Sequence, residues 1–245
     1  MILRSAARTD VGRKRRANED RYALAPDRGL FLVADGMGGH TAGQVASELA
    51  AEAAVGALSA LEGADLKLSE RLRHAVAAAN RSIFASSRAR PELAGMGTTL
   101  VALLAGGGRV ALAHVGDSRA YLIRGGRIRQ LTDDHSLVAE LVRRREISES
   151  DARGHPHRHV LTRALGVRRS VEADLAELTP ASGDLFVLCS DGLTGHVDDA
   201  EIARRAASGP DLERVCDELV ELANSRGGED NITVVLVACE KPGEA

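Results

Sequence analysis

The stretch LFLVADG at residues 30–36 places five apolar residues directly before Asp35 and Gly36. A short apolar run that ends in turn residues is typical of a buried β-strand. Asp-Gly is itself a favoured turn dipeptide, so a single pair of this kind usually indicates only a turn. The interpretation changes because apolar segments end in aspartates elsewhere in the chain as well.

Three more aspartates lie at the ends of apolar segments: Asp191 after residues 185–190, Asp117 after residues 109–115, and Asp230 before residues 232–235. If the strand that follows Asp230 runs antiparallel to the strands before Asp35 and Asp191, all four acids can lie at one edge of the sheets.

Carboxylates gathered in this way need a counter-charge. Two of them ~4 Å apart repel by about 4 kcal/mol at an effective dielectric of ~20. They would take up protons or spread apart unless a cation holds them. Oxygen ligands select Mg²⁺ or Mn²⁺ over zinc, and the carbonyl of Gly36 can approach a metal because no side chain is in the way. The pattern therefore predicts a hard-metal site.

The remaining pattern predicts an α+β fold rather than a doubly wound α/β fold. Periodicity predicts helices at residues 42–61, 69–87, 199–207 and 211–225, and strands at 21–25, 30–34, 98–104, 109–115, 119–124, 185–190 and 232–239. Turn residues at 105–108 and 116–118 predict two consecutive hairpins, which indicate antiparallel sheets with grouped helices. Repeats and linkers are absent from the sequence, so residues 1–245 are interpreted as one domain.

Residues 135–166 differ in character from the rest of the chain. A short helix is expected at residues 137–145, and residues 149–159 are polar. This pattern predicts a mobile surface excursion near the functional site.

Composition excludes several functional classes. The 245 residues are 44% hydrophobic with a net charge of -3, which gives no general attraction to nucleic acid or anionic membranes. With 2% aromatic residues and no Trp, no base-stacking platform is expected.

Cys189, Cys216 and Cys239 are interpreted as buried thiols in a reducing compartment. No apolar run approaches the ~18 residues of a membrane span and residues 1–10 lack a signal peptide, so a cytoplasmic location without nucleic-acid or membrane partners is expected.

Basic residues precede further acids near the N-terminus: residues 12–16 read GRKRR and residues 18–20 read NED. Most basic runs are solvated surface. Beside acids, a guanidinium instead suggests bidentate capture of a phosphate held by metals.

Six motifs now stand in order along nearly the whole chain: GxxRxxNED at 12–20, ADGMGGH at 34–40, GTT at 97–99, VGDSR at 115–119, SDGL at 190–193 and DNIT at 230–233. Together they resemble the PP2C-type (PPM) protein phosphatases in their bacterial form. The resemblance implies a four-layer α/β/β/α sandwich, in which two antiparallel β-sheets are flanked by helix pairs and a flap near residues 135–166 governs substrate choice. It also implies hydrolysis of phosphoserine and phosphothreonine with Mg²⁺ or Mn²⁺.

The resemblance assigns metal ligands by motif. Asp35 is implied to bridge two metals, and the Gly36 carbonyl to bind one of them. Asp191 and Asp230 are implied to complete the other metal's ligands. A third, weaker metal is implied at Asp117 together with Asp191.

It also assigns residues around the metals. Glu19 and Asp20 are implied to act mainly through metal-bound waters, and Arg15 to hold the substrate phosphate. Relatives from higher organisms carry His between the two glycines where this chain has Met37, and the nearest histidine is His40. Either His40 or a metal-bound water can protonate the leaving alkoxide, or His40 can be only a cap or packing residue.

A mechanism follows from these roles. Two cations ~3.5–4 Å apart would be expected to generate hydroxide from a bridging water at neutral pH. The hydroxide would attack phosphorus in line without a phosphoenzyme, while Arg15 and the metals would neutralise the phosphoryl oxygens. The expected enzyme is a monomer that acts on phosphoproteins, with a cognate Ser/Thr kinase and its targets as partners. The alternative is a catalytically inactive phosphoprotein-binding adaptor of the same fold, which would be expected to lack one or more acids; a small-molecule phosphatase also stays open.

Three further features carry predictions of their own. The alternating histidines at residues 155–159 favour a polar loop over a metal site, because no Cys or acid partner is suitably spaced. Arg163 either ties the flap to the core or forms a surface salt bridge. Thr98 and Thr99 are expected to be strand residues whose hydroxyls hydrogen-bond the backbone or support the ligands.

Overall fold

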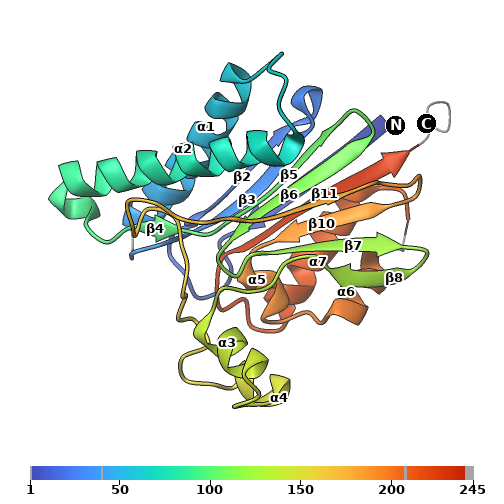
Figure 1. Ribbon diagram of the computed structural model, residues 1–245. Coiled ribbons are helices and arrows are strands. Elements are labelled where there is room, and N and C mark those ends of the chain that lie inside the picture. The colour runs from blue at the N-terminus through green and yellow to red at the C-terminus, as the bar shows by residue number, and fades with distance from the viewer. Residues whose placement is uncertain (1, 40, 207–208, 241–245) are drawn as a thin grey trace.

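Two antiparallel β-sheets lie face to face in the computed structural model, and a pair of helices covers the outer face of each sheet (Figure 1). The structure describes residues 2–39, 41–206 and 209–240. Within these residues, the first sheet has the order β1 (Ile2–Asp10), β11 (Ile232–Glu240), β10 (Leu185–Cys189), β7 (Arg119–Arg124) and β8 (Arg127–Gln130). The second has the order β2 (Asp20–Ala25), β3 (Leu30–Met37), β5 (Leu100–Gly106), β6 (Arg109–Val115) and β9 (Asp174–Leu178), with β4 (Gly97–Thr98) paired to β3. The predicted four-layer α+β sandwich is confirmed.

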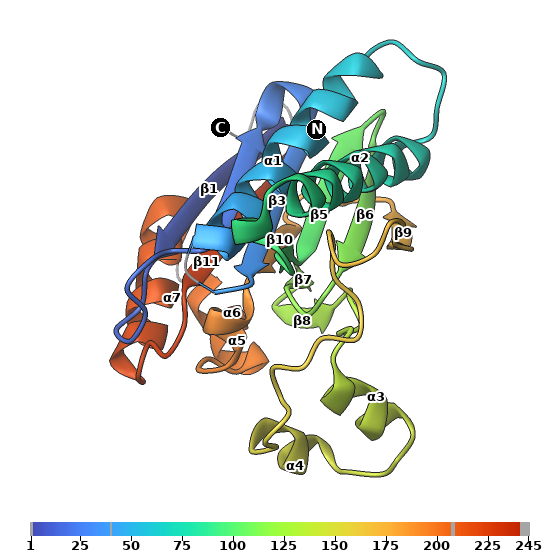
Figure 2. The ribbon, with the colours of Figure 1, turned by 90° about the vertical axis from the view of Figure 1, so that its left-hand side faces the viewer.

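The helices are α1 (Thr41–Ala60), α2 (Leu68–Ala89), α3 (Leu137–Arg143), α4 (Glu149–Arg153), α5 (Asp191–Thr194), α6 (Asp199–Ala206) and α7 (Leu212–Ser225), with single 3₁₀ turns at Pro26–Arg28 and Pro91–Leu93. The α1–α2 pair packs on the second sheet, while α7 packs on β1 and β11 with α6 beside it (Figures 1 and 2). The four main helices thus form within two residues of their predicted limits. No helix among the described residues is both long and apolar enough to cross a bilayer.

Strand β3 shows why the central strands are apolar throughout. Leu30 and Leu32 belong to the core beneath α1 and α2, whereas Phe31 and Val33 belong to the core between the sheets. All four side chains are fully buried. Successive side chains of a strand point to opposite faces, so a strand covered on both faces carries no polar alternation.

The predicted hairpin at residues 105–108 is confirmed, because Gly106 pairs with Arg109 across β5 and β6. The predicted hairpin at residues 116–118 is wrong. β6 pairs with β5 and β9, whereas β7 pairs with β10 and β8, so residues 116–118 carry the chain from one sheet to the other. Both strands are buried on both faces, and for this reason their hydrophobic pattern does not reveal which sheet each one joins.

Other differences concern polar or interrupted segments. Strands β1, β8 and β9, together with the single-turn helix α5, were not predicted; β1 and β9 form sheet edges and mix polar with apolar residues. The predicted strand at residues 98–104 is broken at Thr99 into β4 and β5. β3 continues through Gly36, so Asp35 lies inside a strand rather than in a turn.

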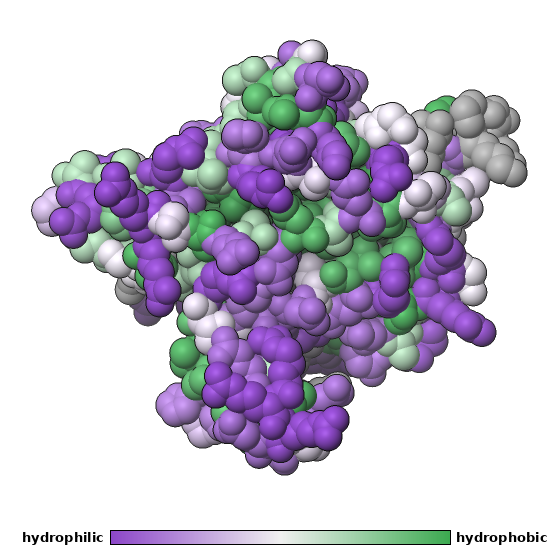
Figure 3. Space-filling view, viewed as in Figure 1, coloured by the Kyte–Doolittle hydropathy of each residue, from purple (hydrophilic) through white to green (hydrophobic). Residues whose placement is uncertain are grey.

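The flap (residues 135–166) projects beyond the sheets with α3 and α4 at its far end (Figures 1 and 2). Figure 3 shows its surface as a mostly hydrophilic lobe. Its two ends lie together, since Ser136 bridges to Leu161, and its last residues join β4 through a bridge from Leu165 to Thr98.

Candidate metal centre

Strand directions bring the predicted acids to one end of both sheets. β3 and β6 are each antiparallel to β5 and therefore run in the same direction. Asp35 near the end of β3 and Asp117 just after β6 thus lie at the same edge of the second sheet. β10 is antiparallel to β11, which places Asp191 at the end of β10 near Asp230 at the start of β11. Asp20 pairs directly with Asp35 across β2 and β3.

Asp20 is the most enclosed of these acids, with 1% of its surface exposed. Its Oδ2 accepts hydrogen bonds from the hydroxyls of Ser190 (2.7 Å) and Thr233 (2.6 Å), while its Oδ1 has no hydrogen-bond partner among the described residues. Burial raises the pKa of Asp20 to about 7 against these hydroxyl bonds, and the charges of Asp191 and Asp230 add to the rise. A buried carboxylate oxygen without a donor is suited to a cation or a cation-bound water.

Asp35 lies among the other acids. Burial raises its pKa well above the ordinary value, and the charges of Asp20, Asp191, Asp117 and Asp230 raise it further. Burial likewise raises the pKa of Asp117, followed by the charge of Asp191. Each of these carboxylates therefore resists ionisation, first because it is buried and then because its neighbours carry the same charge.

Two threonines fix the backbone of Asp35. The Asp35 N–H donates to Oγ1 of Thr99 (2.9 Å), and the Asp35 carbonyl accepts from the Thr98 hydroxyl (2.8 Å). Thr99 Oγ1 also lies 2.7 Å from the hydroxyl oxygen of Ser118, next to Asp117. The prediction that their hydroxyls hydrogen-bond the backbone is confirmed, whereas only Thr98 is a strand residue, because Thr99 lies between β4 and β5.

Glycines allow the backbone to close around the predicted Gly36 carbonyl. A Cβ at Gly36 would lie 2.1 Å from the carbonyl oxygen of Gly43 on α1 and 2.6 Å from that of Glu19. A Cβ at Gly43 would lie 2.3 Å from Oε2 of Glu19. The N-terminal turn of α1, β3 and the segment before β2 therefore approach one another more closely than any side chain would allow.

Arg15 lies over the acids and is open to solvent. Its Nη2 is 2.7 Å from Oδ2 of Asp230, and about half of its side chain is exposed. The hydrogen bond to Asp230 raises the pKa of Arg15, with smaller contributions from the charges of Glu19 and Asp35. The cation thus stands at the rim of the acid cluster, where an anion from solvent can reach it.

Several supporting residues were not singled out from the sequence. Asn231 accepts the Glu19 N–H at 2.8 Å and donates to the carbonyls of Val11 and Ala17, so it holds the basic segment against β11. Ser190 and Thr233 hold Asp20 as described above. All three lie inside the motifs quoted from the sequence. A hydroxyl or amide side chain close to an aspartate in such a motif is the sequence feature from which they could have been predicted.

Residues of the flap approach the acid cluster. His159 Nδ1 lies 3.9 Å from Oδ2 of Asp191, and Asp191 is the main cause of a raised pKa at His159. Arg158 lies 3.8 Å from Glu229. Arg163 ties the end of the flap to β9 through a part-exposed ion pair with Asp174, so both interpretations of this residue hold.

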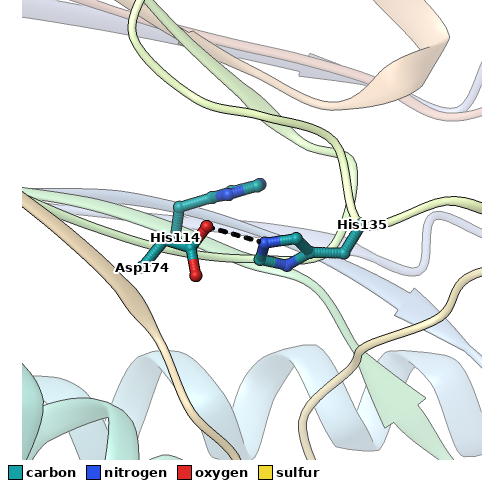
Figure 4. Close-up of side chains that lie close together, drawn as sticks. All are labelled: His114, His135 and Asp174. Carbon is teal, nitrogen blue, oxygen red and sulfur yellow. Dashed lines mark hydrogen bonds and ion pairs between the residues drawn. The ribbon is translucent and has the colours of Figure 1, made fainter. Parts of the chain in front are cut away.

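One group of three possible ligand atoms within 4.8 Å of one another occurs among the described residues, at His114, His135 and Asp174 (Figure 4). The acids at the sheet ends form no group of three this compact among the described residues, as expected for like charges that share one site. The histidines at residues 155–159 form no such group there either. His40, the predicted acid catalyst, lies outside the described residues.

The acids nevertheless fit hard divalent cations. The donors are carboxylate and carbonyl oxygens, which Mg²⁺ and Mn²⁺ prefer. Asp20 offers a buried oxygen without a partner in the described part of the chain, and glycines at positions 36 and 43 let the backbones approach each other there. The sheet ends therefore form the candidate metal centre.

Comparison with known proteins agrees with this arrangement. The family described as Protein phosphatase 2C matches residues 10–232. The chain is 44% identical over 236 residues to the serine/threonine phosphatase stp of Listeria welshimeri, covering 94% of this chain and 93% of that protein. The crystal structure of the Mycobacterium tuberculosis serine/threonine phosphatase PstP/Ppp matches with a TM-score of 0.90 at 41% identity, covering 98% of this chain and 100% of that one. The catalytic domain of the phosphatase PstP in complex with two manganese ions matches with a TM-score of 0.87 at 39% identity, covering 98% and 99%. The resemblance seen in the motifs is confirmed, and the chain belongs to the protein phosphatase 2C family.

Proposed function

We propose that this protein phosphatase hydrolyses phosphoserine and phosphothreonine in proteins with Mg²⁺ or Mn²⁺ as cofactor. The observation that carries the proposal is the gathering of acids from β2, β3, β6, β10 and β11 at one end of both sheets, with the Arg15 guanidinium at their rim. The relatives named above are described as serine/threonine phosphatases, and one of them contains two manganese ions, which supports the substrate and cofactor classes.

The cations would be held by the carboxylates of Asp35, Asp191 and Asp230 and by the carbonyl of Gly36. When bound, two such cations make water a nucleophile at neutral pH and offset charge on the phosphoryl oxygens. Asp117 would serve a third and weaker cation together with Asp191. The pKa of Asp35 and that of Asp117 are raised by burial and by neighbouring carboxylates, so both favour any nearby positive charge.

Glu19 and Asp20 would act through waters of these cations. The Oδ1 of Asp20, which has no partner within residues 2–39, 41–206 and 209–240, is suited to accept such a hydrogen bond, while Oδ2 is held by Ser190 and Thr233. Orientation by two hydroxyls keeps the carboxylate in one position, because each hydroxyl fixes the same oxygen from a different strand end.

Arg15 would bind the substrate phosphate. Its guanidinium carries several N–H donors in a planar fork, and Asp230 engages one nitrogen, Nη2. The remaining donors can form parallel bonds to phosphate oxygens. Asp230 would therefore orient the guanidinium as well as serve a cation. The role of His40 in protonating the leaving group stays a prediction.

The substrates proposed are phosphoproteins, among them a cognate Ser/Thr kinase and its targets. We propose that residues 1–245 form one catalytic domain and that it acts as a monomer. An adaptor without activity would be expected to have lost part of the acid set, whereas the acids of all five strand ends are present.

The test compares Asp35→Asn and Asp191→Asn with Asp65→Asn, a matched control at an exposed loop position. Both site variants should lose Mn²⁺-dependent release of phosphate from a phosphothreonine peptide and should bind less Mn²⁺, whereas the control should behave as wild type. Retained turnover in both site variants would contradict the proposal. Binding of the phosphopeptide by the Mn²⁺-loaded wild type without turnover would favour the adaptor.

A further inference from the structure

A second cluster of titratable side chains lies against Gly116, the residue before Asp117. Figure 4 shows its members: His114 on β6, His135 at the base of the flap and Asp174 at the start of β9. His114 is 1% exposed and His135 is 4% exposed. The two rings lie against each other with centroids 4.6 Å apart. The proposed chemistry at the sheet ends assigns no role to this cluster.

His135 makes hydrogen bonds that fix the protonation of its ring. The Gly116 N–H donates to Nδ1 at 3.0 Å, so Nδ1 must present a lone pair. The proton of the neutral ring is then on Nε2, which lies 3.1 Å from Oδ2 of Asp174 and donates to it. Burial lowers the pKa of His135 despite the nearby Asp174, which keeps the ring in this neutral form.

This tautomer argues against a transition-metal site at the cluster. A metal at Nε2 of His135 would need the lone pair where the proton lies, and would leave a donor at Nδ1 facing the Gly116 N–H. The other carboxylate oxygen of Asp174 is already paired with Arg163. His114 has no hydrogen-bond partner on either ring nitrogen among the described residues, and burial lowers its pKa to about 3. His114 is therefore uncharged and packs its ring against that of His135.

The backbone that His135 holds is the crossing between the two sheets. In addition to the bond at Nδ1, the His135 N–H donates to the Gly116 carbonyl at 2.8 Å. Gly116 has a φ of 108°, and a Cβ there would lie 2.6 Å from the Thr99 side chain. His135 thus binds both polar backbone groups of Gly116 from one side, while Thr99 closes the other side.

We propose that His135 is a positioning residue for Asp117. Asp174 fixes the tautomer of His135, His135 fixes Gly116 through two hydrogen bonds, and the Asp117 carboxylate is thereby held toward Asp191. The carbonyl of His135 also accepts the N–H of Thr162, so the same residue joins this turn to the segment in which the flap returns to the sheets. The inference rests on the proposed function, in which Asp117 serves a third and weaker cation.

Two substitutions at His135 separate its two nitrogens. Asn places an amide oxygen near the position of Nδ1 and can still accept from Gly116, whereas Gln reaches the position of Nε2 and can bind only Asp174. His74→Gln, on the exposed face of α2, is the matched control. Mn²⁺ binding is followed by the electron paramagnetic resonance signal of free Mn²⁺, beside phosphothreonine-peptide turnover at increasing Mn²⁺.

We expect His135→Gln to weaken the weakest Mn²⁺ site by about 10–100-fold, the range for losing a group that orients a metal ligand. The Mn²⁺ concentration for half-maximal turnover should rise in parallel, and Asp117→Asn should change both in the same direction. His135→Asn and the control should retain the wild-type weak site. Unchanged Mn²⁺ binding in His135→Gln or in Asp117→Asn, or equal impairment in His135→Asn, would overturn the inference.

Substitutions at Asp174 provide a second test if the buried His135 variants do not fold. The Asp174 side chain is half exposed, so its replacement should be tolerated. Asp174→Asn still offers an oxygen to Nε2 and should retain the weak site, whereas Asp174→Ala frees the tautomer and should weaken it; equal behaviour of the pair would count against the inference. Turnover retained in Asp35→Asn would instead refute the proposed function. An inactive Asp35→Asn beside a fully wild-type His135→Gln would refute the positioning role alone.

Discussion

Gly43 and Gly56 lie on the same helix, α1, and differ in what a methyl group would meet. A Cβ at Gly43 would lie 2.3 Å from Oε2 of Glu19 and 2.9 Å from the carbonyl carbon of Gly36. A Cβ at Gly56 would meet no heavy atom of the described residues within 4 Å, apart from its chain neighbours and the adjacent helix backbone. We therefore expect the same Gly→Ala change to have opposite effects at the two positions.

The magnitudes follow from the surroundings. At exposed Gly56, alanine removes the entropic cost of glycine in a helix and should stabilise the fold by about 0.5–1 kcal/mol. At Gly43, the 2.3 Å contact is 1.1 Å shorter than the 3.4 Å at which ordinary contact begins. The Glu19 side chain can rotate away, but Gly36 can move only with β3. Overpacking of this kind costs about 1–3 kcal/mol, and it displaces the carbonyl that we propose binds a cation.

Thermal unfolding in EDTA measures the first effect, because 1 kcal/mol shifts Tm by about 2–4 °C in a chain of this size. Gly56→Ala should raise Tm, and Gly43→Ala should lower it by several degrees. A Mn²⁺ titration of phosphothreonine-peptide turnover should then show a higher Mn²⁺ requirement for Gly43→Ala alone. A Gly43→Ala variant with wild-type Tm and wild-type Mn²⁺ dependence would refute the close approach of α1 and β3.

Two further outcomes are expected at the acid cluster. The pKa of Asp20 is about 7 in the folded chain against 3.8 as an ordinary value, so the folded state binds more protons between these values and stability falls as pH rises through this range. Unfolding in EDTA at pH 5 and pH 8 should show this loss, and Asp20→Asn should reduce the difference; an equal difference in the variant would contradict the assignment. Arg15→Lys keeps the positive charge but loses the planar fork, so kcat/KM should fall about tenfold, or ~1.4 kcal/mol, mainly through KM in steady-state kinetics. An unchanged KM would exclude Arg15 from phosphate binding.

The helices and strands that could be predicted are those whose burial produces a recognisable spacing of apolar residues along the sequence. The four main helices each carry an apolar face, and strands such as β3 are apolar because both of their faces are covered. The same full burial hid which sheet each strand joins, and the hairpin expected at residues 116–118 failed for that reason. Edge strands β1 and β9 were missed because their composition is partly polar.

At the metal centre, the acids could be predicted because Asp beside Gly at an apolar strand end is visible in the sequence. The residues whose hydrogen bonds hold these acids in place could not be identified from the sequence in the same way. Ser190 and Thr233 reach Asp20 from strand ends more than 150 positions along the chain, as their separations of 170 and 213 show. His135 acts on Gly116, which neighbours it only after the chain has crossed between the sheets. Contacts of this kind depend on the three-dimensional pairing of segments, which no local pattern encodes.

The acid end of the sandwich opposes folding, and this is the strongest physical sign that it serves function. The β2–β3 register sets Asp20 directly across from Asp35, where like charges repel and burial penalises both. A neutral pair would stabilise the same strands without that cost. The chain instead surrounds the acids with hydroxyl and amide groups that fix their positions, and it retains glycines where any side chain would push the backbones apart. Local features that disfavour folding yet are held in place by their surroundings are expected at sites that bind a compensating charge, which we propose is supplied here by divalent cations.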